Sequence, residues 1–401
     1  MSTTSVSQMH VAIVGGGPGG LSLAAILKKL QIRYTVFELD PSRFARSQGG
    51  TLDIHKDSGR LALEEAGLLD EFKKHMRVDA TELYVRDKTG AVLMHDTEEG
   101  EEDPARPEID RARLRDILLD ALEPETIKWG KKVSSVSYTD GEGGRKFSLD
   151  FADGTSAGGF DILVGADGVW SKVRSLRSDV LPPYSGAMCV STSISSFSDK
   201  YPQLAAFVGK GSSMCIGGKD LVVAQKNGDG SVKTYIIFPG PENWKDVSGI
   251  DWSKPQKEVL ENFMETYYSD WSDTTKQLIA LCDEGELAVR PLYQYPPGYS
   301  FEKKLAGVTL LGDAAHVMTP LAGVGVNLAL HDAFDLAHAL QKIEAGTSAE
   351  QAIGEYEAVM FERATKNVTK TQQNQNLFLK GLEVKDIMDG LAQVFGGGEE
   401  H

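Results

Sequence analysis

A glycine-rich stretch near the start of the chain has the residue types and spacing to hold a dinucleotide. It reads Gly15-x-Gly17-x-x-Gly20, and Glu38 follows at the end of the next apolar run. Gly15 allows a tight turn, Gly17 lets the backbone approach a pyrophosphate, and Gly20 lets a helix pack closely on a strand. The pyrophosphate would lie at the helix N-terminus and Glu38 would bind a ribose hydroxyl. The alternative is a glycine-rich turn beside a surface glutamate, and this motif alone does not distinguish NAD from FAD.

Two later stretches place a carboxylate directly after an apolar strand. "DILVGADGVWSKVR" carries Asp167, and "LLGDAAHVMTPLAGVGVN" carries Asp313. The second continues into a loop whose glycines let the backbone come close to a ligand before a helix begins. The loop residues that we expect at a cofactor are Pro320, Gly323, Gly325 and Asn327. His316 is a tempting catalytic base, although a packed or hydrogen-bonded histidine beside the loop is the more ordinary interpretation.

The elements that must position these motifs form an interrupted α/β pattern. Residues 10–38 read as strand, helix, strand; 111–122 read as a helix; and 306–316 resume strand then helix. The middle of the chain, about 180–290, has alternating strand-like runs, with a hairpin turn predicted at 227–230. After Gly325 the pattern is almost continuously helical to about Leu379, and a short helix is expected near 384–395.

This pattern predicts a Rossmann-like α/β domain interrupted by a mostly β substrate domain. We expect the first part of the nucleotide domain at 1–178 and the inserted domain at 179–295. The second part of the nucleotide domain would follow at 296–380, and a C-terminal helix and tail at 381–401.

Charge and composition narrow the functional classes. The net charge is −16 and the pI is about 5.0, which argues against nucleic acid and against an anionic membrane surface as partners. The three cysteines have no metal-binding spacing, and no metal site is expected. No stretch reaches 18 uninterrupted apolar residues, and the N-terminus has no export-signal pattern. We therefore expect a soluble, cytoplasmic protein, and a monomer.

The three motifs, in this order and at these separations, resemble the fingerprints of the class A flavoprotein monooxygenases, which have the para-hydroxybenzoate hydroxylase fold. The resemblance spans about residues 10–380. It implies FAD as the cofactor, with Asp313 on a hydroxyl of the ribityl chain and the 320–327 loop beside the isoalloxazine. A helix N-terminus there would stabilise negative charge on reduced flavin.

A narrower resemblance links "FARSQGGTLDIHKDSGRLALEEAGL" and "PEIDRARLRDILLDAL" to the tetracycline-inactivating flavin monooxygenases. It implies that Arg46 acts with NADPH and that Asp53 and Arg111 contact FAD. The alternatives are surface charges for the two arginines and a turn-capping acid for Asp53.

The substrate positions depart from that group. Ser191 and Ser212 fall near the positions where those enzymes carry a glutamine and an arginine. The planar, multidentate arginine contact is then missing, so we expect slow or absent turnover of tetracycline.

The resemblance implies a hydroxylation that consumes NADPH and O₂. Reduced flavin would form a C4a-hydroperoxide, which transfers oxygen to an aromatic, phenolic or polyketide-like small molecule. No catalytic side chain is then needed, since the cofactor carries the chemistry. The alternatives are a flavin oxidase or dehydrogenase on the same fold, or a non-catalytic flavin-binding sensor.

Overall fold

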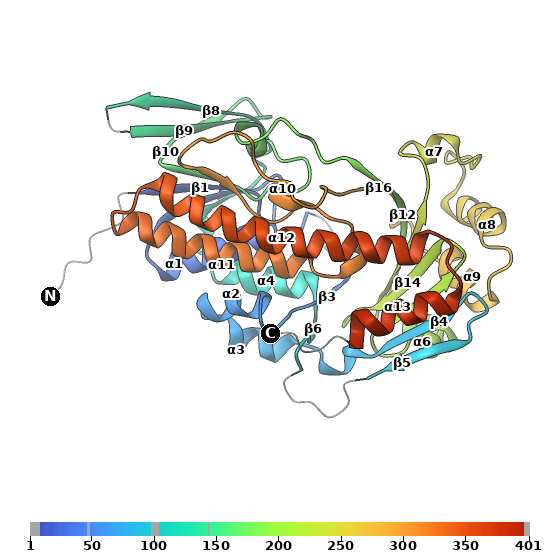
Figure 1. The fold of residues 1–401 in the computed structure, drawn as a ribbon. Helices are drawn as coiled ribbons and strands as arrows, with labels where there is room; N and C mark the ends of the chain where they lie inside the picture. Colours follow the sequence, from blue (N-terminus) through green and yellow to red (C-terminus); the bar gives the residue numbers. More distant parts are fainter. Residues whose placement is uncertain (1–8, 46–48, 98–103, 143, 397–401) are drawn as a thin grey trace.

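The computed structural model describes residues 9–45, 49–97, 104–142 and 144–396. Over these residues the chain forms four β-sheets with helices packed around them (Figure 1). The long helix α12 (Ala349–Leu379) runs beside α11 (Gly325–Glu344) and reaches the second large sheet with its C-terminal end (Figure 1). The expected α/β fold is confirmed.

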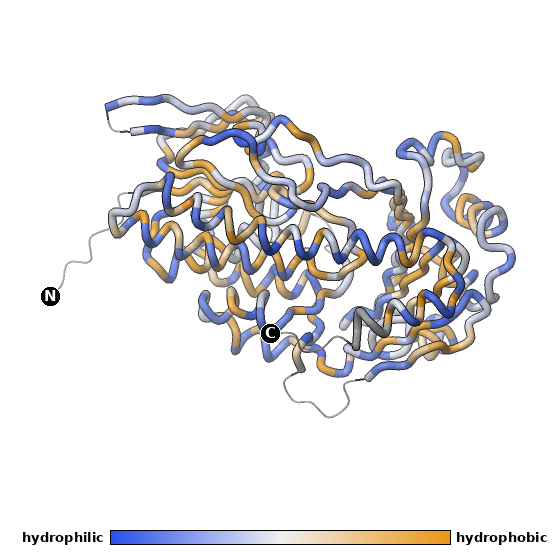
Figure 2. Tube along the Cα trace, in the orientation of Figure 1, coloured by the Kyte–Doolittle hydropathy of each residue, from blue (hydrophilic) through white to orange (hydrophobic). Residues whose placement is uncertain are grey.

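The first large sheet is parallel, in the order β17-β11-β1-β2-β7. In β1 the residues Val11, Ala12, Ile13 and Val14 are all buried, as expected for a parallel strand covered on both faces. The helices cover one face, and the antiparallel sheet β10-β9-β8 lies over the other (Figures 1 and 2). The strands of both sheets are β1 (His10–Val14), β2 (Arg33–Phe37), β7 (Ile127–Lys128), β8 (Val133–Gly141), β9 (Gly144–Phe151), β10 (Ser156–Phe160), β11 (Ile162–Gly165) and β17 (Val308–Leu310).

Helix α1 (Pro18–Lys29) begins where the glycine motif predicts. Gly17 is its N-cap and Pro18 its first residue, where a missing N–H costs nothing. Lys28 and Lys29 occupy the last turn, where they complement the helix dipole. The helix packs against α11, with Gly19 at the close approach of the two backbones.

The second large sheet has the order β16-β12-β15-β14-β13-β4-β5. All its pairings are antiparallel except that of β13 with β4. One face is covered by α8 (Gln256–Tyr267) and α9 (Asp273–Ala280), and the other contacts the end of α12 and α13 (Val384–Gly396). Its strands are β4 (Leu83–Asp87), β5 (Val92–Asp96), β12 (Tyr184–Ile194), β13 (Ser212–Gly217), β14 (Asp220–Lys226), β15 (Val232–Pro239) and β16 (Ala288–Tyr293).

The structure changes the predicted division of the chain at two points. The segment 83–96, which we expected in the first part of the nucleotide domain, supplies two strands of the seven-stranded sheet. The pairing of β4 with β13 spans about 130 residues of sequence, and hydrophobic periodicity carries no information on such a partner. The inserted segment also contains more helix than expected: α5 (Phe197–Lys200), α6 (Pro202–Val208), α7 (Trp244–Val247), α8 (Gln256–Tyr267) and α9 (Asp273–Ala280).

A two-stranded ribbon, β3 (Thr51–Asp53) with β6 (Glu108–Asp110), joins the two large sheets. Asn327 of α11 donates to the carbonyl of Asp53, and Gly228 in the β14–β15 turn donates to the carboxylate of Asp110. The remaining elements are α2 (Gly59–Glu65), α3 (Leu69–His75), η1 (Val78–Thr81), α4 (Arg111–Asp120), η2 (Pro124–Thr126), η3 (Val173–Leu176), α10 (Asp313–His316), η4 (Pro320–Ala322) and α13 (Val384–Gly396).

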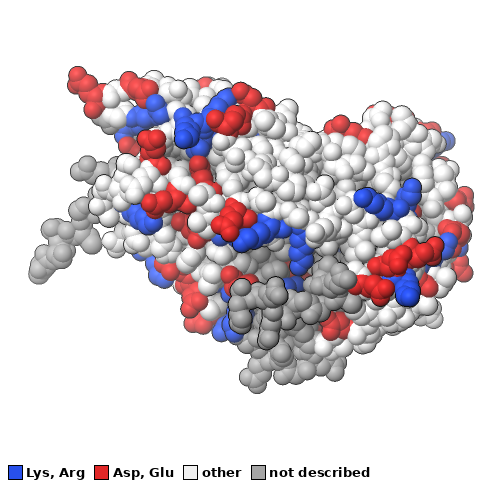
Figure 3. Space-filling view, in the orientation of Figure 1, with Lys and Arg blue, Asp and Glu red and all other residues white. Residues whose placement is uncertain are grey.

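Acidic and basic side chains are interspersed on the face shown in Figure 3, with no single basic patch on it. Among the described residues, none of the helices combines the length and the apolar character needed to cross a membrane.

Candidate cofactor and substrate site

Four of the predicted cofactor residues follow neighbouring strands at one edge of the five-stranded sheet. Asp313, Asp167, Gly15 and Glu38 come shortly after β17, β11, β1 and β2, which are adjacent in that order. Because these strands are parallel, their carboxyl ends share one edge, and open α/β sheets bind ligands there. The sequence motifs, spread over about 300 residues, therefore meet at one place.

The three glycines of the first motif have different surroundings. Gly15 has φ +109°, and a Cβ there would lie 2.2 Å from the carbonyl oxygen of Ala166. A Cβ on Gly20 would lie 2.1 Å from the carbonyl oxygen of Gly15, so only glycine allows this helix–strand approach. A Cβ on Gly17 would meet no atom within 4 Å. Gly17 is thus the motif glycine whose backbone faces open space at the N-terminus of α1.

Glu38 and Asp167 lie beside this turn. The backbone N–H of Gly16 donates to Glu38 Oε2 (2.5 Å), and that of Asp40 donates to Oε1 (2.9 Å). Asp167 Oδ2 accepts from the N–H of Lys172 (2.7 Å), while its Oδ1 is buried and has no hydrogen-bond partner among the described residues. Burial raises the pKa of Asp167. A hydroxyl that donates to Oδ1 would supply the hydrogen bond that this buried oxygen lacks.

Asp313 begins α10 at the same edge. It is exposed to solvent, yet protein surrounds its carboxylate closely enough that desolvation raises its pKa, against the opposing charges of His316 and Arg111. This combination is expected for a group inside a recess. Arg111, the first residue of α4, is therefore near Asp313, and its N–H donates to the carbonyl of Gly50 (3.0 Å).

The predicted flavin loop lies between α10 and α11. Pro320 opens the short helix η4, and Gly323 takes the left-handed conformation with φ +68°. A Cβ on Gly323 or Gly325 would meet no atom within 4 Å, so the loop and the first turn of α11 leave room for a ligand.

Asn327 and Asp53 fasten this loop to the ribbon. Asn327 is buried; its Nδ2 donates to the carbonyl of Asp53 (2.9 Å) and its Oδ1 accepts from the N–H of His55 (2.8 Å). Both ends of its amide are thus used by protein backbone. The Asp53 carboxylate is paired with His55 Nε2 at 2.8 Å. In the structure both residues therefore hold the loop against β3, and their direct contact with FAD stays a prediction.

His316 has the ordinary role rather than the catalytic one. It is buried, and its Nε2 lies 2.6 Å from Asp332 Oδ2, which also accepts from the N–H of Gly312 (2.9 Å). Arg363 of α12 donates to Asp332 Oδ1 (3.0 Å). Burial alone would lower the pKa of His316, but the charge and hydrogen bond of Asp332 outweigh it and raise the pKa. This network holds the turn after β17 in place.

Ser191 and Ser212 lie on one face of the seven-stranded sheet but not side by side. Ser191 pairs with Tyr235, whereas Ser212 pairs with Gln225, which in turn pairs with Lys233. Two strands separate β12 from β13, so the two serines are roughly 15 Å apart. One small molecule touching both would also lie over β15.

Sequence reasoning missed three polar residues on this face: Lys233, Tyr235 and Arg290. Tyr235 packs in the same cluster as Leu321 of the flavin loop. A Cβ on Gly50 would lie 2.7 Å from Tyr235 Oη, and one on Gly49 would lie 2.7 Å from Lys233 Nζ. Side chains alternate along a strand, so the predicted hairpin implies that Lys233 and Tyr235 share one face of β15. The sequence does not say which face meets the cofactor.

Arg46 lies outside the described residues, so the structure does not place this predicted NADPH contact.

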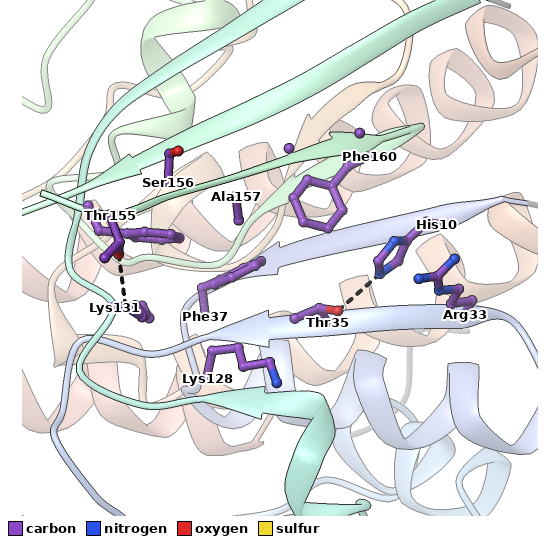
Figure 4. Close-up of a pocket in the computed structure, with 13 residues that line it drawn as sticks. His10, Arg33, Thr35, Phe37, Lys128, Lys131, Thr155, Ser156, Ala157 and Phe160 are labelled. Atoms are coloured by element: carbon purple, nitrogen blue, oxygen red, sulfur yellow. Dashed lines mark hydrogen bonds between the residues drawn. The ribbon is translucent and has the colours of Figure 1, made fainter.

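A separate cavity of about 510 Å³ lies between β2, β7 and the β8–β10 sheet (Figure 4). Part of its polar lining is already engaged: His10 Nε2 lies 3.0 Å from Thr35 Oγ1, and Lys131 donates to Asp153 and Thr155. None of the predicted cofactor or substrate residues lines it. Its size therefore does not make it the active site.

Comparison with known proteins agrees with the geometry at the sheet edge. Residues 8–195 and 303–371, well over half of the chain, match the family described as "FAD binding domain". The chain belongs to this family. The matched residues contain all three glycine-rich motifs, and the gap between the two matched segments contains most of the seven-stranded sheet.

The relatives of this chain include monooxygenases. Monooxygenase penA of Penicillium thymicola is 29% identical, over 92% of this chain and 95% of that protein. The chloroplastic zeaxanthin epoxidase of an Oncidium hybrid cultivar is 31% identical, over 84% of this chain and 49% of the epoxidase. The chain is accordingly an FAD-dependent monooxygenase, as the sequence predicted.

Solved structures confirm the fold. HpxO of Klebsiella pneumoniae, complexed with FAD and uric acid, has a TM-score of 0.76 at 20% identity, covering 98% of this chain and 94% of its own. Tetracycline destructase Tet(55) has a TM-score of 0.74 at 18% identity, covering 99% and 96%. At these identities the likeness concerns the fold alone.

Proposed function

We propose that this protein hydroxylates a small aromatic, phenolic or polyketide-like molecule, with FAD bound at the carboxyl edge of the five-stranded sheet and NADPH as the reductant. The observation that carries the proposal is the meeting of Gly17, Asp167 and Asp313 at that edge. Gly17 borders open space, Asp313 is exposed to solvent, and Asp167 Oδ1 is a buried acceptor with no hydrogen-bond partner among the described residues.

The residues fit FAD in three respects. The open N-terminus of α1 suits a pyrophosphate, since its N–H groups have no partner inside the helix. Asp167 and Asp313 offer carboxylate acceptors for hydroxyls of the cofactor. The η4 loop and the first turn of α11 present backbone N–H groups near Gly323 and Gly325. When bound, FAD supplies the redox chemistry and oxygen activation.

The substrate would lie between the flavin loop and the seven-stranded sheet. Leu321 packs against the Tyr235 side of that sheet, so a ligand lying over Ser191 and Tyr235 is next to the loop. The protein's tasks there are to orient the reacting carbon and to keep water away from the reactive oxygen.

Names of relatives support an aromatic substrate. One relative, 25% identical over 94% of this chain, is the 6-methylsalicylate 1-monooxygenase atA of Aspergillus terreus. One solved structure with the same fold is a salicylate hydroxylase substrate complex. Tetracycline is a poorer expectation, since Ser191 and Ser212 offer only short hydroxyl side chains where a large polar molecule needs several contacts.

The test is a stopped-flow screen of phenols, phenolic acids and polyketides, including tetracycline, for faster flavin reduction by NADPH. Oxygen uptake and product mass are then measured for each active compound. We expect a product 16 mass units heavier from a phenolic compound and little or none from tetracycline. Flavin that NADPH does not reduce with any compound would contradict the proposal, as would turnover that yields hydrogen peroxide and a dehydrogenated product.

A further inference from the structure

The substrate face of the seven-stranded sheet carries more positive charge than its surroundings balance. Lys233 on β15 and Arg290 on β16 lie on the same face as Tyr235, and Arg111 of α4 lies close by. None of the three cations forms an ion pair within 4.0 Å in the described part of the chain.

The register shows how these groups converge. Lys233 pairs with Ser193, Tyr235 with Ser191, and Arg290 with Cys189. The Cα atoms of Lys233 and Arg290 are therefore roughly 16 Å apart on a diagonal, with Ser191 and Tyr235 between them. Two long, flexible side chains at this spacing can both reach a group that lies over Tyr235.

The nearby titratable groups do not neutralise the cluster. Glu286 raises the pKa of Lys233 but does not lie within ion-pair distance of it, and Asp313, on the cofactor side, lies near Arg111. Cys189 stays a neutral thiol because burial raises its pKa to about 12. The pKa of Lys233 is lowered by burial and then by Arg290 and Arg111, so a bound anion would relieve repulsion among the cations.

Tyr235 adds a directional donor. Its phenol makes no hydrogen bond to any described residue, although it is largely enclosed by protein. A buried or half-buried hydroxyl normally finds a partner, so this one is available to a ligand.

Resting on the proposed function, we infer that the substrate is an acid: a carboxylate or ionised enol or phenol on the aromatic molecule is held between Lys233 and Arg290, with Tyr235 Oη donating to it. The other end of the molecule then points toward the flavin loop, on the Leu321 side of the cluster.

The inference predicts discrimination between an acid and its neutral amide. Holoprotein is titrated with 2-hydroxybenzoate, 1-hydroxy-2-naphthoate and anthraquinone-2-carboxylate, each beside its amide, and binding is followed by the change in the FAD absorbance bands. We expect at least one acid to bind roughly tenfold or more tighter than its amide, as expected for a charge-assisted contact. No preference for any acid would overturn the inference, and so would binding of none of them.

Variants locate the contact. Lys233→Met keeps the aliphatic stem and should weaken the preferred acid roughly ten- to a hundredfold while leaving its amide within about twofold. Lys233→Arg should retain most of the affinity for the acid. Tyr235→Phe should lose less of that affinity than Lys233→Met does. Arg33→Gln is the control, because it also removes a positive charge. Arg33 is exposed and begins β2, at the end of the strand away from the cofactor residue Glu38. Equal losses for acid and amide in Lys233→Met would indicate a merely structural lysine.

A second source of negative charge is the phosphate of NADPH. If Lys233→Met raises the apparent Michaelis constant for NADPH and leaves acid binding unchanged, the cluster binds the phosphate of NADPH and the inference is wrong. Wild-type protein that binds acids but never takes up oxygen with NADPH would instead contradict the proposed function.

Discussion

The candidate functional residues occupy different positions in the five-stranded and the seven-stranded sheet. In the five-stranded sheet each predicted cofactor residue follows the end of its own strand, so a short sequence motif is enough to predict it. Gly15 follows β1, Asp167 follows β11 and Asp313 follows β17. In the seven-stranded sheet, Lys233, Tyr235 and Arg290 lie within strands, and only the pairing of β12 with β15 and β16 brings them together. Edge sites can be read from short motifs, whereas face sites depend on register.

The two regions also differ in how they are made rigid. The turn after β17 is held by the buried network of Asp332, His316 and Arg363. The seven-stranded sheet is held by apolar side chains on both faces, with aromatic residues such as Trp244 and Phe263 on one of them. Polar networks fix direction, and apolar packing fixes position, so the cofactor side should be the more sensitive to loss of a single charge.

The largest effect is expected from Asp332→Ala, which leaves buried His316 without its partner and removes one of the two carboxylates that pair with Arg363. We expect a loss of about 3–5 kcal/mol in the free energy of unfolding, measured by urea denaturation. The ionised Asp332 contributes above its unfolded pKa and loses its contribution as pH falls. His316, whose pKa is raised, contributes below about pH 6.5 and loses its contribution as pH rises through its folded pKa.

The difference between wild type and Asp332→Ala should therefore be greatest at about pH 4–6.5. Glu362→Ala, which breaks an exposed pair with Lys366, is the control and should change the free energy of unfolding far less, because solvent screens the pair. A similar cost for both variants would show that the network does not stabilise the cofactor side.

The next effect separates folding from cofactor binding within one motif. Gly20→Ala places a Cβ against the carbonyl of Gly15 and should destabilise the protein by about 1–3 kcal/mol, seen in thermal unfolding without added FAD. Gly17→Ala has room for its Cβ and should fold like the wild type, yet retain less FAD on purification. Gly17→Ala with full FAD content would remove this glycine from the pyrophosphate site.

A third change tests whether cofactor and substrate residues act separately. Asp313→Ala should weaken FAD retention by about 1–3 kcal/mol, the cost of one charge-assisted hydrogen bond, in an equilibrium titration of apoprotein. Ser191→Ala, on the other sheet, should leave FAD affinity unchanged. Supernatant from acid-precipitated protein should contain FAD; FMN or NAD in its place would contradict the assignment.

The smallest effect concerns Glu108 in the ribbon between the sheets. Burial raises its pKa to about 7, although Thr51 donates to its Oε2 (2.5 Å) and Arg77 opposes the shift. An unfolded glutamate ionises near pH 4.5, so the folded protein loses stability as pH rises from about 4.5 to 7. Glu108→Gln should therefore gain about 1 kcal/mol relative to wild type between pH 5 and 8.

Exposed Glu284 provides the control for that measurement, since Glu284→Gln should show no such pH-dependent gain. Identical pH profiles for wild type and Glu108→Gln would mean that Glu108 is ionised in the folded protein throughout this range.

The sequence predicted the cofactor half of the protein well because its determinants are local. A βα turn with Gly15 and Gly20 has one workable geometry, and it can be recognised without knowing any distant contact. The strand order β17-β11-β1-β2, which only the structure shows, brings Asp313 and Asp167 to the same edge. The strand ends and the hairpin at 227–230 were predicted for the same reason.

Tertiary structure decided what depends on partners far apart in sequence. It placed β4 and β5 in the seven-stranded sheet, bonded the two ends of the Asn327 amide to the backbone of Asp53 and His55, and paired His316 with Asp332. Tertiary packing also determines which face of β15 meets the flavin loop. The strand register places Lys233 and Tyr235 on the same face as Arg290. Side-chain alternation along a strand has two equally regular outcomes, and only packing against Leu321 and the C-terminal helices selects one.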